Sequence, residues 1–113
     1  MTVKRFMAIH TFHSEKTRED LWSGIAEDTS TQKDWAKHWT FDKCKCIATW
    51  SGQDDDFFFC HWLADTEDDI HNAIKENGLD QFVFTACYEA HNYIDTACLS
   101  DERAFQIKKT AEA

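Results

Sequence analysis

The chain has 113 residues, of which 42% are hydrophobic and 14% aromatic, and its formal net charge at pH 7 is −9. This length suits one domain, and the negative charge disfavours nucleic-acid binding, which depends on neutralising phosphates with lysine and arginine. No apolar run approaches the roughly 20 residues that cross a bilayer, and the first residues lack the apolar stretch of a signal peptide. We therefore expect a cytoplasmic protein that neither binds nucleic acid nor inserts into a membrane.

Apolar periodicity and end signals predict four strands and three helices in the first 90 residues. In chain order they are a strand over residues 3–12, a helix from Ser14 to about Glu27, a short helix over residues 33–39, a strand over residues 40–51, a strand over residues 57–64, a helix opened by Thr66 and a strand over residues 81–89. Ser14 and Thr66 are of the types that cap helix N-termini, and Gly78 can end the last helix in the left-handed conformation.

The strand over residues 57–64 is apolar on both faces. Because side chains alternate along a strand, the two faces carry Phe57, Phe59, His61 and Leu63 on one side, and Phe58, Cys60, Trp62 and Ala64 on the other. A regular hairpin with residues 40–51 would place Cys46, Ala48 and Trp50 beside the second set. One layer of helices covers one face only, so we expect a second copy of the chain to cover the other.

The order β-α-β-β-α-β predicts an α+β protein with the ferredoxin-like arrangement, a four-stranded antiparallel sheet with helices on one face. Burial of the open face against a twofold mate would give a homodimer of the dimeric α/β barrel type. We assign residues 1–95 to this domain and residues 96–113 to a C-terminal extension, with a short helix at residues 101–109.

A more specific signal lies within residues 59–79. The segment combines Phe59-Cys60, Ala64-x-Thr66, Ile70, Ala73 and Asn77-Gly78-Leu79. These positions resemble the Phe-Cys strand, the Ala-x-Ser/Thr helix start and the Asn-Gly-Leu stop of a bacterial family of small ferredoxin-like proteins of unclear function. One branch of that family is described as nickel-binding. The family's prolines at the helix start are absent here, where Asp65 and Glu67 stand. The resemblance implies the fold described above and makes nickel the cofactor to consider.

The cysteines offer a possible metal site. An odd count of five without an export signal indicates reduced thiols. Thiolate and imidazole groups suit nickel, zinc or copper, and neighbouring strands make His10, Cys46 and Cys60 the candidate ligands. No dense signature such as C-x-x-C is present, and buried cysteine often serves as a small hydrophobe. We therefore favour no metal or other cofactor from the sequence.

The aromatic residues suggest a ligand pocket between the sheet and the helices. Five tryptophans and nine phenylalanines are many for a chain of this length, and a few polar groups among them would orient a bound molecule. The predicted ligand-binding residues are His10, Trp22, His38, Trp39, Trp50, Phe58, Trp62, Phe84 and Tyr88.

Catalysis is a further hypothesis. A histidine buried on an apolar face has a perturbed pKa and can act as an acid or base, which makes His10 and His61 the catalytic candidates. The leading hypothesis is a homodimer that binds a small, largely apolar organic molecule, with or without turnover. The alternatives are a nickel or other transition-metal binding protein, and a cofactor-independent oxygenase or isomerase of the dimeric α/β barrel type.

Overall fold

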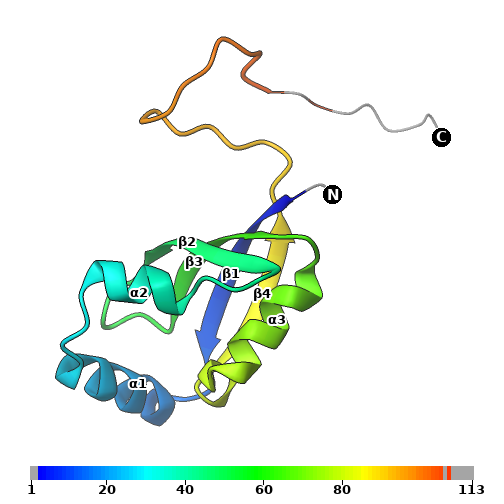
Figure 1. The fold of residues 1–113 in the computed structure, drawn as a ribbon. Helices are drawn as coiled ribbons and strands as arrows, with labels where there is room; N and C mark the ends of the chain where they lie inside the picture. The colour runs from blue at the N-terminus through cyan, green and yellow to red at the C-terminus, as the bar shows by residue number, and fades with distance from the viewer. Residues whose placement is uncertain (1–2, 106, 108–113) are drawn as a thin grey trace.

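A computed structural model describes residues 3–105 and 107 of the chain (Figure 1). Its elements are β1 (Lys4–Phe12), α1 (Glu15–Glu27), α2 (Gln32–His38), β2 (Cys44–Trp50), β3 (Phe57–Ala64), α3 (Glu67–Glu76), a 3-10 turn (Leu79–Gln81) and β4 (Val83–Glu89). The four strands and three helices match those predicted from the sequence. No helix in the described ranges combines the length and the apolar character that a membrane span requires.

The four strands form one open antiparallel sheet in the order β2-β3-β1-β4. The three helices lie on one side of this sheet, with α3 along β4 and α2 in front of β2 (Figure 1). The protein is thus a small α+β domain, and its element order is consistent with the predicted ferredoxin-like arrangement. The sheet presents one face to the helices and leaves the other, here called the open face, without a helical layer.

The predicted helix signals are present in the structure. The Ser14 side chain accepts a hydrogen bond from the Thr17 backbone N–H, and the Thr17 side chain accepts one from the Ser14 backbone N–H, forming a capping box on α1. Thr66 forms the same box with Asp69 on α3. Gly78 follows α3 with φ of 75°, a left-handed conformation that glycine adopts without a Cβ clash. The chain then turns back into β4.

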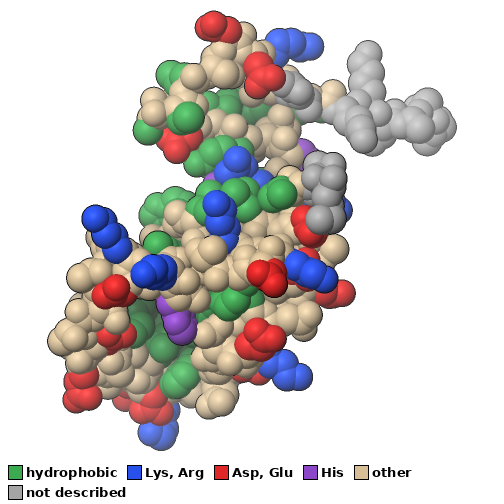
Figure 2. All heavy atoms as spheres, in the orientation of Figure 1, with side chains coloured by type: hydrophobic (Ala, Val, Ile, Leu, Met, Phe, Trp, Pro, Cys, Tyr) green, Lys and Arg blue, Asp and Glu red, His purple; other side chains and the backbone are tan. Residues whose placement is uncertain are grey.

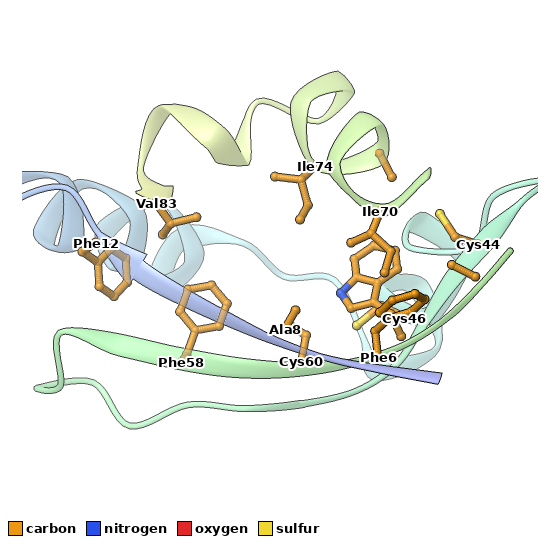
Figure 3. Packing of buried hydrophobic residues seen from close by; sticks show 13 residues of the cluster. Phe6, Ala8, Phe12, Cys44, Cys46, Phe58, Cys60, Ile70, Ile74 and Val83 are labelled. Atoms are coloured by element: carbon orange, nitrogen blue, oxygen red, sulfur yellow. The ribbon is translucent and has the colours of Figure 1, made fainter. Parts of the chain in front are cut away.

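The main core lies between α3 and the sheet. Ile70, Ala73 and Ile74 of α3 are buried, and they pack above Ala8 of β1 and Cys60 of β3 (Figure 3). By contrast, α1 has no buried residue. The helical layer is therefore packed closely on the sheet at α3 but stands off it at α1.

The predicted regular hairpin between β2 and β3 is wrong. Cys46 pairs with Trp62, but Ala48 then pairs with His61 because β2 contains a bulge between Cys46 and Ala48. The extra residue reverses the faces of everything after it. As a result Ala48 and Trp50 lie on the open face.

The segment after β4 has no regular secondary structure through residue 105. It leads away from the sheet (Figure 1), although Tyr93 returns to it, since Arg5 stacks over the Tyr93 ring at 4.1 Å. Residues 101–105, the first part of the predicted C-terminal helix, are not helical. Residues 106, 108 and 109 of that prediction lie outside the described residues.

Candidate functional site

A cavity of about 600 Å³ lies between the sheet and the helices α1 and α2. Its walls are mainly aromatic, with contributions from Trp22, Trp35, Trp39, Phe58, Trp62 and Phe82. Hydrophobic side chains are visible in a recess between the helices, with acidic side chains around it (Figure 2). The cavity is thus an apolar chamber with a polar rim.

The cavity exists because α1 does not close onto the sheet. Leu21 and Trp22, the inward residues of α1, are only half-buried and pack at the edge of the core. Phe12 and Phe58 of the sheet meet the Trp22 ring at centroid distances of 6.1 and 6.0 Å. These large rings hold α1 away from β1 and β3 and leave space beside them.

Six of the nine predicted ligand-binding residues line this cavity, namely His10, Trp22, His38, Trp39, Phe58 and Trp62. The other three do not. Trp50, Phe84 and Tyr88 lie on the open face, with 52%, 66% and 58% of their surface exposed. The bulge accounts for Trp50. Phe84 and Tyr88 pair with Thr11 and Met7, whose side chains also point away from the helices.

His10 is the most deeply buried polar side chain of the cavity wall, with 0% exposure. Its Nδ1 lies 2.8 Å from Thr85 Oγ1 on β4, and its ring packs against Phe58 on β3 at 4.7 Å. Neighbours on two strands therefore fix the orientation of the imidazole. Its Nε2 has no hydrogen-bond partner among the described residues.

Two further nitrogen atoms of the cavity wall share this property. Trp22 Nε1 and Trp62 Nε1 are buried without a hydrogen-bond partner in the described structure. Buried polar groups nearly always have a partner, so each exception needs an explanation. Here all three unpartnered atoms, including His10 Nε2, belong to residues that line one cavity. Two indole donors and one imidazole nitrogen thus lie unpartnered in side chains of the cavity wall.

Two thiols lie in the same wall. Cys46 and Cys60 are 5% and 7% exposed, and the sulfur of Cys60 lies 3.4 Å from Thr49 Oγ1. A hydrogen bond with Cys46, supported by His10, holds the pKa of the Cys60 thiol well below its usual range. The same contact, together with burial, raises the pKa of the Cys46 thiol.

His61, the other catalytic candidate, lies on the open face, outside the cavity. It is 6% exposed beneath Tyr93, and Arg5 Nη1 donates to its Nε2 at 2.8 Å. Burial, followed by the charge of Arg5, lowers the pKa of His61. This histidine is thus a neutral acceptor that ties the C-terminal segment to the sheet.

A separate cluster of metal-ligand types joins α3 to β4. The ligand atoms of Glu67, His71 and Cys87 all lie within 4.8 Å of one another, and His71 Nε2 is 2.9 Å from Glu67 Oε2. Burial, with the charge of Glu67, raises the pKa of Cys87 to about 12. The predicted ligands His10, Cys46 and Cys60 form no such compact group within the described part of the chain.

Several residues of these sites were not predicted from the sequence. Thr49 and Ser51 reach the cavity only because of the bulge, and Asp28, Ser30 and Asp34 line its rim from the ends of α1 and α2. No pattern in the sequence marks a bulge. The spacing of Glu67 and His71, four residues apart on one helix face, was a signal that could have been found.

The chain matches no protein-family model, no curated protein and no solved structure.

Proposed function

We propose that the protein is a ferredoxin-like homodimer of the α/β barrel type that binds a small, largely apolar organic molecule in the cavity between the sheet and α1 and α2. The ligand has a carbonyl or carboxylate end. The observation that carries this proposal is that three buried nitrogen atoms without a hydrogen-bond partner, His10 Nε2, Trp22 Nε1 and Trp62 Nε1, all belong to side chains that line one aromatic cavity. An acceptor oxygen that reached the two indole N–H groups would remove the cost of leaving these donors unpaired.

The size and lining of the cavity support the same class of ligand. Small-molecule sites are concave, largely apolar and about 300–1,000 Å³ in volume, with a few polar groups that fix orientation. The volume here, about 600 Å³, lies within that range. An aromatic ketone or acid would place its ring among the tryptophans and its oxygen on the indole donors. A strongly charged or sugar-like molecule would find too few hydrogen-bonding groups among the tryptophans of the cavity wall.

The open face supports the homodimer. Its large apolar side chains include Met7, Ile47, Trp50, Phe57, Phe84 and Tyr88, each at least 40% exposed. Contiguous apolar patches of this kind are rare on monomers and mark interaction surfaces. A second copy offers the same flat apolar surface, and a twofold axis lets the two faces cover each other.

Native mass spectrometry of the purified protein tests the proposal. We expect a dimer that carries a co-purified organic mass or takes up added benzylacetone, a small aromatic ketone. Leu21→Trp, which fills the cavity from α1, should abolish this binding. The matched variant Leu99→Trp, on the exposed C-terminal segment, should retain it. A dimer that binds neither a cellular molecule nor benzylacetone would contradict the cavity proposal.

A second candidate function, metal binding, is favoured by the cluster of Glu67, His71 and Cys87. One carboxylate, one imidazole and one thiolate form a donor set that suits zinc or nickel. We expect His71→Ala to abolish uptake of added nickel or zinc, measured by elemental analysis after desalting, and His91→Ala to leave it unchanged. Equal metal content in the two variants would exclude this site.

A further inference from the structure

Three reactive groups from three strands share one wall of the cavity. His10 on β1, Cys46 on β2 and Cys60 on β3 all line it. Cys60 is the diagonal neighbour of His10, because His10 pairs with Phe58, two residues before Cys60. The bulge places Thr49 directly opposite Cys60. A thiol thus stands beside an imidazole in a chamber large enough for an organic molecule.

We propose that Cys60 is a nucleophile that captures an electrophilic ligand, an α,β-unsaturated carbonyl compound, inside this cavity, with His10 as its acid–base partner. This inference rests on the proposed function, because the electrophile must enter the cavity to react. It goes further in naming the reactive class of the ligand and the bond that forms.

The step requires no oxidant and releases no leaving group. With Nδ1 donating to Thr85 Oγ1, His10 Nε2 accepts the proton of the Cys60 thiol. The thiolate sulfur then forms a bond to the β-carbon of the ligand, and the π electrons move to the carbonyl oxygen as an enolate. The proton held by His10 is finally delivered to the α-carbon. The net change is addition of S–H across the carbon–carbon double bond.

Three features of the wall favour this step. His10 Nε2 is buried and has no other partner in the described structure, so it is available to the thiol proton. The indole N–H groups of Trp22 and Trp62 belong to the cavity wall and have no hydrogen-bond partner in the described structure; donors of this kind stabilise developing negative charge. The lowered pKa of Cys60, caused by Cys46 and His10, supplies thiolate at neutral pH.

The remaining cysteines are poorer nucleophiles or lie elsewhere. Burial raises the pKa of Cys44 to about 11 and that of Cys87 to about 12, and neither lines the cavity. Contact with Cys60 raises the pKa of Cys46, which keeps its proton and serves as a hydrogen-bond donor. Cys98 is exposed on the C-terminal segment and does not line the cavity. Cys60 also has the geometry for the role, since it lies in the cavity wall, diagonal to His10 and opposite Thr49.

The test is incubation of the full chain with benzylideneacetone at neutral pH, followed by intact mass spectrometry and peptide mapping. We expect one adduct with the mass of the ketone, located on Cys60. It should be absent from Cys60→Ser, retained in Cys98→Ser and formed about a hundredfold more slowly in His10→Gln, in line with the usual contribution of a positioned acid–base group. An adduct confined to Cys98, or no adduct, would overturn the inference.

Benzylacetone, the saturated analogue, separates this inference from the proposed function. It has the same ring and carbonyl but no carbon–carbon double bond, so it can occupy the cavity without reacting. If benzylacetone binds and benzylideneacetone forms no adduct on Cys60, the reactive-thiol inference is wrong and the proposed binding function stands. If neither ketone binds or reacts, both are wrong.

Discussion

Thr49 lies opposite Cys60 across β2 and β3, and its Oγ1 is 3.4 Å from the Cys60 sulfur. This relationship exists because the β2 bulge turns Thr49 towards the helices and Trp50 away from them. It gives the thiol a hydroxyl neighbour in addition to Cys46 and His10. The environment of Cys60 is consequently polar on one side and aromatic on the other.

Removal of the Thr49 hydroxyl should make Cys60 less reactive. In Thr49→Val one hydrogen-bonding group that lowers the pKa of Cys60 is lost, so less thiolate is present at neutral pH. We expect alkylation of Cys60 by benzylideneacetone to slow several-fold. Thr11→Val, on the open face, is the control and should alkylate at the wild-type rate. Equal alkylation rates in both variants would show that Thr49 does not affect the reactivity of the Cys60 thiol.

The alkylation rate of Cys60 should fall only when the pH drops below neutrality. A thiolate whose pKa is lowered stays reactive as the pH falls below the ordinary thiol range, about 8.5, and is lost only near its own lower pKa. The groups that face it from the neighbouring strands are His10, Cys46 and Cys87. We expect the rate to be level from pH 8 to pH 7, measured by quenched mass spectrometry. A tenfold fall over that interval would indicate an unperturbed thiol.

The contact between α3 and the sheet should dominate stability. Ile70 is fully buried, with 0% exposure, so Ile70→Ala should lower the free energy of unfolding by about 2–5 kcal/mol. Ile94, 49% exposed on the C-terminal segment, is the matched control, and Ile94→Ala should change it by less than about 0.5 kcal/mol. Urea denaturation followed by circular dichroism measures both. A similar loss of unfolding free energy in the two variants would contradict the position of Ile70 in the core.

A charge on the open face should weaken the dimer. Phe84 is 66% exposed, so Phe84→Arg is accommodated in the monomer but would bury an unpaired charge between two sheets. We expect a shift from dimer to monomer in light scattering at micromolar concentration. Leu99→Arg, a substitution at a similarly exposed leucine (68%), should remain dimeric. A wild-type monomer, or an unchanged Phe84→Arg dimer, would exclude the open face as the interface.

The architecture could be predicted because its determinants are local. The capping types at Ser14 and Thr66, the glycine at position 78 and the alternation in β1 each specify an element from a few neighbouring residues. The strand over residues 57–64 also revealed its two apolar faces through alternation alone. The order of strands and helices along the chain then left few ways to assemble the sheet.

The site was harder to predict because it depends on one extra residue in β2. That residue moved Trp50 to the open face and brought Thr49 to the cavity, and nothing in the local sequence distinguishes the bulge from a regular strand. The partners of His10 come from β3 and β4, more than 45 positions away in the chain. Such contacts follow from register, and register is set by the whole sheet.

The most direct test of the account is a titration with benzylacetone followed by the indole N–H signals of the tryptophans in nitrogen–proton correlation spectra, assigned with single Trp→Phe variants. We predict that the Trp22 and Trp62 signals shift as the ketone oxygen accepts their hydrogen bonds, while Trp50 on the open face does not respond. Shifts confined to Trp50, or no shift of any indole signal at saturating ketone, would contradict ligand binding in the cavity.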